Sequence, residues 1–279
     1  MNLAQALAAA STLGLDRLDA QLLLLDALGR ADSDRAWLLA HDTDALAEEA
    51  RVAFIAACQR RAAGEPLAYI VGRKEFFGLD LQVDARVLVP RPETETLVEW
   101  ALEVASGKAR VIDLGTGSGA IALAIKKHLP GATVEAVDAS AGAVALAMGN
   151  ARALGLEVEF TQASWLAGTS LSYDVIVSNP PYIAQGDRHL AALKHEPVQA
   201  LQAGPDGLRD LRAIVVQAPQ RLRAGGWLLL EHGWDQAPAV RGLLQAAGFG
   251  AVASRRDLAG LERCSGGKWL ETGIIEPNV

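Results

Sequence analysis

The spacing of apolar and polar positions changes along this chain. Over the first 75 residues or so, apolar residues recur every three or four positions, which is the spacing of one helix face. The run that shows it best is Leu15, Leu18, Leu22, Leu25 and Leu28. Three glycines are candidate helix ends: Gly14, Gly29 and Gly64. The pattern predicts an all-helical domain at 1–75, and we expect it to dock a substrate because it holds no catalytic constellation.

A segment of different character follows at residues 76–92. Apolar and polar residues partly alternate from Phe76 to Val89, which favours two paired strands. We expect Asp84-Ala85-Arg86 to form the turn between them and Pro90-Arg91-Pro92 to end the pattern. The segment is therefore predicted to be a β-hairpin linker, followed by a helix with Thr94 as its N-cap.

From about residue 108, short apolar runs alternate with helical patterns. Strands are expected at 109–113, 133–138, 157–161, 174–178, 226–231, 249–254 and 268–274, and helices at 119–128, 140–154, 208–223 and 235–247. This alternation predicts an α/β fold for residues 93–279, with a doubly wound, mostly parallel seven-stranded sheet. Ligands bind such sheets at the carboxyl ends of the strands, near the switch in strand order.

A glycine-rich run follows the first of these strands. The residues Gly115-Thr116-Gly117-Ser118-Gly119 permit a tight turn and close approach of a ligand to the backbone. Asp138 ends the next strand, about 20 residues on, where a carboxylate can accept hydrogen bonds from ribose hydroxyls. Taken alone, this half of the site fits both NAD and S-adenosylmethionine.

Two further residues bear on that choice. Asp113 stands just before the glycines, where a carboxylate suits an amino-bearing sulfonium better than a pyrophosphate. Trp165 follows the strand at 157–161 and is a candidate to stack on an adenine ring. Asp113 therefore favours S-adenosylmethionine.

The second informative motif is Asn179-Pro180-Pro181-Tyr182, directly after the strand at 174–178. Methylating a planar NH₂ group is difficult because its lone pair is delocalised. The Asn179 side-chain oxygen and a carbonyl of the rigid Pro-Pro backbone can accept its two hydrogens, and Tyr182 can stack on the planar group. Holding the nitrogen in line with a methyl group supplies much of the rate. The two motifs in this order predict an N-methyltransferase.

Composition narrows the function further. Of 279 residues, 51% are apolar and 21% are charged, and the net charge of −7 argues against a protein that grips nucleic acid stably. One candidate basic patch lies at 51–74 and comprises Arg51, Arg60, Arg61, Arg73 and Lys74. A solvated helix face is the better interpretation of this segment.

The two cysteines, Cys58 and Cys264, lie far apart, and the histidines lack metal-ligand spacing. The start lacks a basic secretion signal and no apolar stretch could span a bilayer, so we expect a cytoplasmic protein without metal.

At this point the chain resembles the bacterial release factor glutamine methyltransferases, which are class I, S-adenosylmethionine-dependent enzymes. The resemblance covers nearly the whole chain. It rests on the motifs above and on four further segments: residues 64–95 with Val87-Leu88-Val89-Pro90-Arg91-Pro92-Glu93-Thr94-Glu95, Glu196-Pro197-Val198-Gln199-Ala200-Leu201, Asp206-Gly207-Leu208, and Asp257-Leu258-Ala259-Gly260-Leu261-Glu262-Arg263. Many members carry an Asp where Ser164 stands here, so adenine-side hydrogen bonding is expected to differ.

The resemblance implies a reaction and a set of site residues. The reaction is N5-methylation of the glutamine in the Gly-Gly-Gln motif of class 1 peptide chain release factors, which supports translation termination and leaves S-adenosylhomocysteine. Cofactor binding falls to Gly115–Gly119, Asp138, Trp165 and Asn179, and the substrate glutamine is held by Asn179–Tyr182. We expect a monomer with a loose tail at 274–279.

Three other functions stay open from the sequence. An N6-adenine nucleic-acid methyltransferase would also use Asn-Pro-Pro-Tyr, but the net charge and the lack of a target-recognition domain weigh against it. An NAD-linked oxidoreductase fits the glycine run and leaves Asn179–Tyr182 unexplained. A non-catalytic scaffold would not need the intact motifs.

Overall fold

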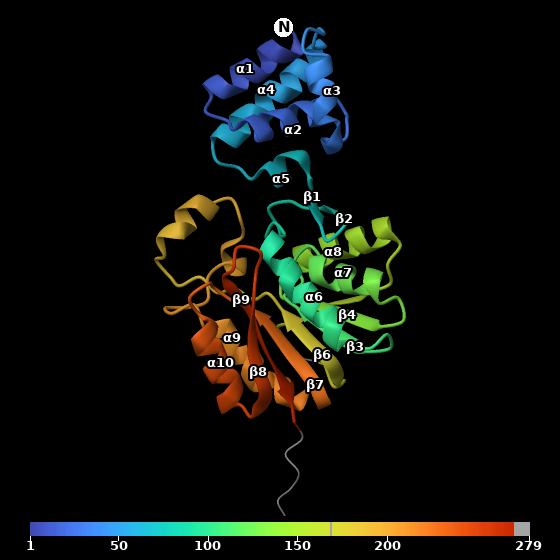
Figure 1. The fold of residues 1–279 in the computed structure, drawn as a ribbon, viewed down its shortest axis with the longest axis vertical. Helices are drawn as coiled ribbons and strands as arrows, with labels where there is room; N and C mark the ends of the chain where they lie inside the picture. The colour runs from blue at the N-terminus through green and yellow to red at the C-terminus, as the bar shows by residue number, and fades with distance from the viewer. Residues whose placement is uncertain (168, 271–279) are drawn as a thin grey trace, which may run out of the picture. The chain divides into compact units, whose positions relative to one another are not determined.

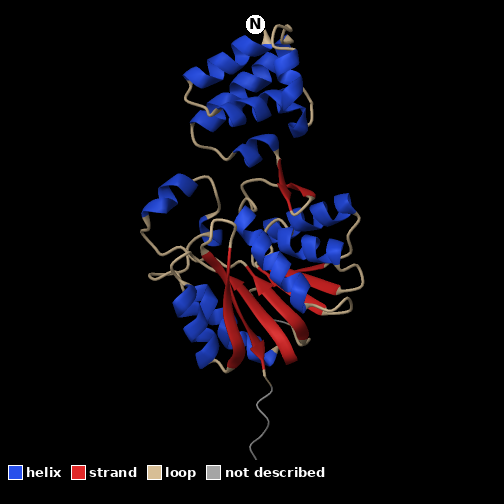
Figure 2. Cartoon of the chain, in the orientation of Figure 1, coloured by secondary structure: helices blue, strands red, loops and turns tan. Residues whose placement is uncertain are grey.

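The computed structural model describes residues 1–167 and 169–270, and the chain divides into two compact units. The helical unit comprises Met1–Arg73 and the sheet unit Lys74–Val279. Figure 1 labels the elements of both units and Figure 2 colours them by secondary structure.

The helical unit is built from five α-helices. They are α1 (Leu3–Thr12), α2 (Arg17–Ala27), α3 (Arg35–Ala40), α4 (Glu48–Ala62) and α5 (Leu67–Val71). Gly14, Gly29 and Gly64 follow the ends of α1, α2 and α4 with positive φ angles, as the sequence predicted. Leu24 and Phe54 lie in the centre of its apolar core.

The candidate basic patch is neutralised by ion pairs. Within the described residues its arginines all contact carboxylates: Arg51 with Glu48, Arg60 with Glu65, Arg61 with Asp19, and Arg73 with both Asp26 and Asp32. These pairs leave little free positive charge to attract phosphates.

The sheet unit contains a seven-stranded sheet in the order β5-β4-β3-β6-β7-β9-β8. The strands are β3 (Arg110–Leu114), β4 (Thr133–Asp138), β5 (Glu159–Gln162), β6 (Tyr173–Ser178), β7 (Leu222–Glu231), β8 (Phe249–Arg256) and β9 (Glu262–Trp269). Strand β9 runs antiparallel to both of its neighbours, β7 and β8, and the other pairs are parallel. The predicted doubly wound, mostly parallel sheet is confirmed, with its switch in strand order between β3 and β6.

Helices cover both faces of this sheet (Figures 1 and 2). On one side lie α6 (Glu95–Val104), α7 (Ala120–His128) and α8 (Ala141–Leu154), and on the other α9 (Arg209–Gln217) and α10 (Ala237–Ala246). Neighbouring strand residues separate between the two layers: Val111 packs in the cluster of α6 and α7, and Ile112 packs in the cluster of α9 and α10. A sheet buried on both faces explains why its strands read as continuous apolar runs.

The position of the hairpin was predicted wrongly. The strands are β1 (Arg73–Phe76) and β2 (Leu79–Gln82), and the turn between them is Phe77-Gly78, with φ angles of +50° and +74°. Two positive φ angles in a two-residue loop suit the twist of a hairpin. The expected turn at Asp84-Ala85-Arg86 does exist, with Val87 N donating to the Asp84 carbonyl, but it lies after the hairpin.

Two boundaries near the end of the chain also differ from the prediction. Helix α9 stops at Gln217 because Pro219 has no N–H with which to continue it. The last strand begins at Glu262 rather than 268, since its centre is Ser265-Gly266-Gly267, which carries no apolar signal. A Cβ on Gly266 would lie 2.6 Å from a Leu229 methyl, so only glycine fits between the strands. The expected tail at 274–279 lies outside the described residues.

Among residues 1–167 and 169–270, no helix has the length and apolar character that crossing a membrane requires.

The core of the helical unit gives a direct test of stability. Leu24 is fully buried, whereas Leu39 is 60% exposed. Leu24→Ala should lower the free energy of unfolding of this unit by about 2–5 kcal/mol, because it leaves a cavity. Hydrogen exchange of the α2 and α4 amides in the full chain measures this. The matched Leu39→Ala variant should change it by less than about 0.5 kcal/mol, and equal effects would contradict this core assignment.

Candidate functional site

Three neighbouring strands bring the predicted motifs to one edge of the sheet. Strand β3 lies between β4 and β6, and Leu114 at its end pairs with Val137 on one side and Ser178 on the other. The Ser178 hydroxyl also donates to the Leu114 carbonyl at 2.7 Å. The glycine run, Asp138 and Asn179 therefore all follow strand ends that lie side by side.

The glycine run wraps back onto β4. Gly115 N and Thr116 N both donate to the Val137 carbonyl, and Gly117 N donates to Asp138 Oδ2 at 2.9 Å. A Cβ on Gly115, where φ is +74°, would lie 3.3 Å from the Trp165 ring. The loop thus passes close under Trp165, and only glycine combines this conformation with this approach.

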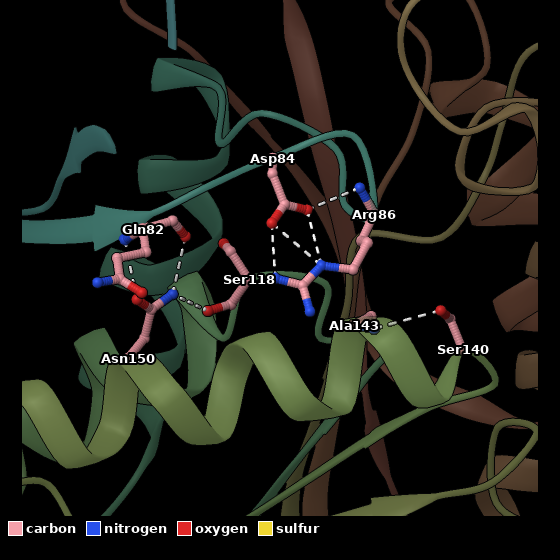
Figure 3. Close-up of polar contacts among 7 residues, drawn as sticks. All are labelled: Gln82, Asp84, Arg86, Ser118, Ser140, Ala143 and Asn150. Carbon is pink, nitrogen blue, oxygen red and sulfur yellow. Dashed lines mark hydrogen bonds and ion pairs between the residues drawn. The ribbon is translucent and has the colours of Figure 1, made fainter. Parts of the chain in front are cut away.

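A buried amide holds the far side of the same loop (Figure 3). Asn150 on α8 donates from Nδ2 to the Ser118 carbonyl at 2.9 Å and to the Gln82 carbonyl at 3.0 Å, and its Oδ1 accepts from Gln82 N at 2.8 Å. Asn150 therefore joins the glycine run to the end of β2. In the same view the Ser140 hydroxyl caps α8 by accepting from Ala143 N at 3.2 Å.

Asp113 lies beneath the glycine run and is fully buried. Its Oδ2 accepts from the Thr116 hydroxyl at 2.6 Å and from Ala122 N at 3.3 Å, while Oδ1 has no hydrogen-bond partner among the described residues. Burial raises the pKa of this carboxyl to about 7, against the lowering effect of Thr116 and Ala122. In this structure Asp113 fixes the start of the loop from below.

The Asn-Pro-Pro-Tyr loop is anchored through its first and last residues. Asn179 Nδ2 donates to the Thr94 hydroxyl oxygen at 3.1 Å, and Asn179 Oδ1 accepts no hydrogen bond from the described residues. Thr94 was expected to cap α6, but its side chain makes no cap hydrogen bond because it faces Asn179 instead. The Tyr182 hydroxyl donates toward Glu231 at 3.4 Å.

The segments that carried the family resemblance form the walls around this loop. A Cβ on Gly207 would lie 2.3 Å from the Tyr182 carbonyl oxygen, so the loop packs against a glycine with φ of +72°. Glu196, which is nearly buried, accepts from Val89 N at 3.2 Å and pairs with Arg91. This carboxylate therefore ties the linker to the segment at 196–201.

A cavity of about 460 Å³ lies between these walls. Of the predicted site residues, eight line it: Gly115, Thr116, Gly117, Ser118, Asp138, Trp165, Asn179 and Pro181. Four do not line it: Asp113, Gly119, Pro180 and Tyr182. Ser164 and Thr94 lie in its wall as well. Among the described residues, no group of three or more His, Cys, Asp or Glu side chains could hold a metal ion.

Three residues at the site were missed from the sequence. Asn150 is a polar residue on the apolar stripe of α8, among Ala143, Leu146, Ala147 and Ala151, and that interruption was a usable signal. Glu231 closes an apolar strand with an acid, as Asp138 does and Asp113 nearly does, and could have been noticed for the same reason. Asp210 lines the cavity but gives no sequence signal.

The fold defines the class of protein. The structure matches a methyltransferase from Pyrococcus furiosus with a TM-score of 0.56 and 19% identity, covering 75% of this chain and 98% of that one. It also matches a 16S rRNA methyltransferase from T. thermophilus in complex with AdoMet and guanosine, with a TM-score of 0.52 and 22% identity over 70% of this chain and 49% of that one. At such identities the likeness shows a class I methyltransferase fold and no more.

Sequence comparison gives the family. Residues 93–236 match the methyltransferase small domain, and residues 2–72 match the PrmC N-terminal domain. The release factor glutamine methyltransferase of Bordetella pertussis is 51% identical to this chain, over 91% of this chain and 95% of its own length. That of Xylella fastidiosa (strain Temecula1) is 50% identical, over 94% of this chain and 97% of its own length. The protein belongs to the release factor glutamine methyltransferase family.

The raised pKa of Asp113 predicts a pH-dependent stability. The pKa of Asp113 is about 7 in the folded state, which is above its value in the unfolded state. Between about pH 4 and 7, the folded state therefore keeps a proton that the unfolded state has already lost. This contribution is fully present at low pH and is lost as pH rises through about 7. Asp113→Asn retains an oxygen to accept from Thr116 and cannot ionise. It should therefore reduce the fall in unfolding free energy between pH 5 and 6.5 by about 1.4 kcal/mol per pH unit.

Urea unfolding of the two proteins at several pH values measures this difference. Glu231, whose pKa is also raised by burial to about 7, should leave a second, similar slope in the Asp113→Asn variant. Identical slopes in both proteins would contradict the assignment of a protonated Asp113.

Proposed function

We propose that this protein transfers a methyl group from S-adenosylmethionine to N5 of the glutamine in the Gly-Gly-Gln motif of class 1 peptide chain release factors. The observation that carries the proposal is the orientation of Asn179. Its Nδ2 is committed to Thr94, so its Oδ1 is the atom left to accept a hydrogen bond from a substrate amide. The names of the Bordetella and Xylella relatives support the same substrate.

The residues around the cavity fit S-adenosylmethionine. Trp165, Gly115 and Gly117 all line the cavity, and Asp138 lies at the end of β4 in the same lining. Both Asp138 oxygens accept backbone hydrogen bonds, from Gly117 N and Ser140 N, which fixes the carboxylate while lone pairs remain for ribose hydroxyls. When bound, the cofactor supplies an electrophilic methyl on a sulfonium sulfur.

Asp113 takes a different part from the one expected. It does not line the cavity, and it accepts hydrogen bonds from Thr116 in the glycine run and from Ala122 in the first turn of α7. We propose that it acts on the cofactor by shaping the glycine run. Its Oδ1 is buried and has no hydrogen-bond partner among the described residues.

The chain's own residues then orient the amide. Asn179 Oδ1 and the Pro180 carbonyl would accept the two amide hydrogens, which turns the nitrogen lone pair toward the methyl. Pro180 is buried and Pro181 lines the cavity, so the backbone between them is stiff. As the new N–C bond forms, the methyl–sulfur bond breaks and S-adenosylhomocysteine is left. The nitrogen becomes more acidic, and one proton leaves toward these oxygen acceptors and then to water. Positioning supplies most of the rate, because no strong base is needed.

The N6-adenine alternative is less supported. Arginines in the cavity wall are paired with carboxylates: Arg86 with Asp84, Arg91 with Glu196, and Arg209 with Asp210. The same holds for the arginines of the candidate basic patch. Phosphate binding needs unpaired positive charge, and the net charge is −7. We therefore propose that the protein makes no stable complex with nucleic acid. We also propose that it acts as a monomer and works in the cytoplasm on its release factor.

The test of this function is an incubation with methyl-labelled S-adenosylmethionine and purified class 1 release factor. A release factor whose Gly-Gly-Gln glutamine is changed to alanine is the control. Label on the wild-type factor alone, located to the glutamine by mass spectrometry, is the expected result. Label on neither factor, with label on nucleic acid offered in parallel, would replace the proposal with the adenine reaction.

The role of Asn179 predicts a separation of turnover from cofactor binding. Asn179→Ala should lower kcat by at least about 100-fold, because it removes an acceptor that orients the reacting nitrogen. The dissociation constant for S-adenosylmethionine, measured by calorimetry, should change by less than about threefold. Gln245→Ala, on the exposed surface of α10, is the matched control and should leave both unchanged. Lost affinity with surviving turnover would overturn this role.

The role of Asp138 predicts the opposite result, a loss of cofactor affinity rather than of turnover at saturating cofactor. Asp138→Ala should weaken S-adenosylmethionine binding by about 10–100-fold, or about 1.4–2.7 kcal/mol, since it removes the ribose acceptor and frees the glycine run. Saturating cofactor should restore much of the turnover. Asp80→Ala, at an exposed position of β2, controls for the loss of a carboxylate. Unchanged affinity in Asp138→Ala would show that the cofactor lies elsewhere.

A further inference from the structure

A buried carboxyl group lies behind the Asn-Pro-Pro-Tyr loop. Glu231 is the last residue of β7, is 1% exposed, and pairs across the sheet with Cys264 of β9. Its Oε2 has no hydrogen-bond partner among the described residues. An acid buried in this way is unfavourable unless its neighbours require it.

Its neighbours are the residues that hold the loop. The Tyr182 hydroxyl donates to Glu231 Oε1 at 3.4 Å. The Thr94 hydroxyl lies close enough to lower the Glu231 pKa, and Thr94 is the residue whose oxygen accepts from Asn179 at 3.1 Å. One carboxyl group therefore faces the residue that orients Asn179 and also the last residue of the loop.

We infer that Glu231 is a positioning residue that sets the orientation of the Asn179 amide through Thr94 and holds Tyr182 through its hydroxyl. The inference rests on the proposed function for its catalytic consequence. In this proposal the Thr94 hydroxyl donates to Glu231 Oε2, the oxygen without a partner among the described residues, because a carboxylate accepts and does not donate. The Thr94 oxygen is then free only to accept, which brings Asn179 Nδ2 to it and leaves Asn179 Oδ1 for the substrate.

The charges around Glu231 make this arrangement sensitive to pH. Burial is the main cause that raises its pKa to about 7; Glu93 raises it further, and Thr94, Arg263 and Tyr182 lower it. Cys264 on β9 is buried beside it and has a pKa raised well above its usual value, so it stays neutral. A protonated Glu231 keeps only one oxygen without a hydrogen, so it could not accept fully from both hydroxyls, and the direction of the Thr94 hydroxyl would no longer be fixed. Turnover should therefore rise as pH increases through about 7.

A second Tyr–Glu pair in the same sheet provides a matched control. Tyr173 donates to Glu135 at 2.8 Å, and Arg110 also donates to that carboxylate, at 3.1 Å. Neither Glu135 nor Tyr173 lines the cavity. Glu135→Gln thus makes the same chemical change away from the site.

The kinetic experiment compares Glu231→Gln, Glu135→Gln and wild type from pH 5.5 to 9, with labelled S-adenosylmethionine and release factor. Glu231→Gln should lower kcat at pH 8 by about 10–100-fold, because its one remaining oxygen cannot accept from both Thr94 and Tyr182, and its NH₂ group then faces a hydroxyl that must itself donate. It should also lose the rise near pH 7, while the KM for the cofactor stays unchanged. Glu135→Gln should keep the wild-type kcat and profile. Should Glu231→Gln fail to fold, Thr94→Val carries the same test.

A second measurement needs no substrate. In protein labelled with ¹³C at glutamate side-chain carboxyls, one resonance should titrate near pH 7 and disappear in Glu231→Gln. Thr94→Val and Tyr182→Phe should each move its midpoint upward, since each removes a hydrogen bond to the charged form. Glutamate labelling keeps Asp113 out of the spectrum.

The two measurements separate the possible failures. Wild-type kcat and profile in Glu231→Gln, or a Glu231 midpoint that ignores both hydroxyl deletions, would overturn the inference. Equal kcat losses in Glu231→Gln and Glu135→Gln would do so too, because they would indicate general destabilisation. If wild type transfers no methyl to the release factor, the proposed function fails, and the titration still decides whether Glu231 holds Thr94 and Tyr182.

Discussion

The parallel pairing of β3 with both β4 and β6 is the constraint on which the site depends. It places the three strand ends in register, with Leu114 beside Val137 and Ser178. This pairing alone places the glycine run, Asp138 and Asn179 at one edge of the sheet. The Ser178 hydroxyl, fully buried and bonded to the Leu114 carbonyl, locks the ends of β3 and β6 together just before the two loops diverge. A slip of one residue here would turn the strands' alternate faces over and separate the loops.

Buried acids hold the two loops from behind. Asp113 lies under the glycine run and Glu231 under Asn179–Tyr182, and burial raises the pKa of each to about 7. Each also retains one oxygen without a hydrogen-bond partner among residues 1–167 and 169–270. Such groups lower stability near neutral pH, and functional sites are where proteins tolerate that loss. Their common position, at or just before the carboxyl end of a central strand, ties this tolerance to the site.

Much of this could be predicted from the sequence, and the reason is local. Apolar runs bounded by turn residues located β3, β4 and β6 within a residue, because a strand buried on both faces leaves a continuous signal. The motifs at their ends were visible because glycine, proline and asparagine have strong backbone preferences. The cavity contains eight of the twelve predicted site residues.

The remainder depends on contacts between distant parts of the chain. Thr94 was assigned to a helix cap by its neighbours in sequence, yet its partner is Asn179, 85 positions away. Glu231 contacts Tyr182, 49 positions away, and Gly266 belongs to a strand where Leu229 packs against it. The hairpin turn was misplaced because Asp84-Ala85-Arg86 is also a turn, and turn chemistry alone does not say which one joins two strands.

The most direct test of the shared strand edge is a crystal structure with S-adenosylhomocysteine and a Gly-Gly-Gln peptide. We predict the ribose hydroxyls on Asp138, the adenine beside Trp165, and the glutamine amide on Asn179 Oδ1, with its nitrogen facing the cofactor sulfur. Cofactor bound outside the cavity, or a glutamine held away from Asn179, would contradict it.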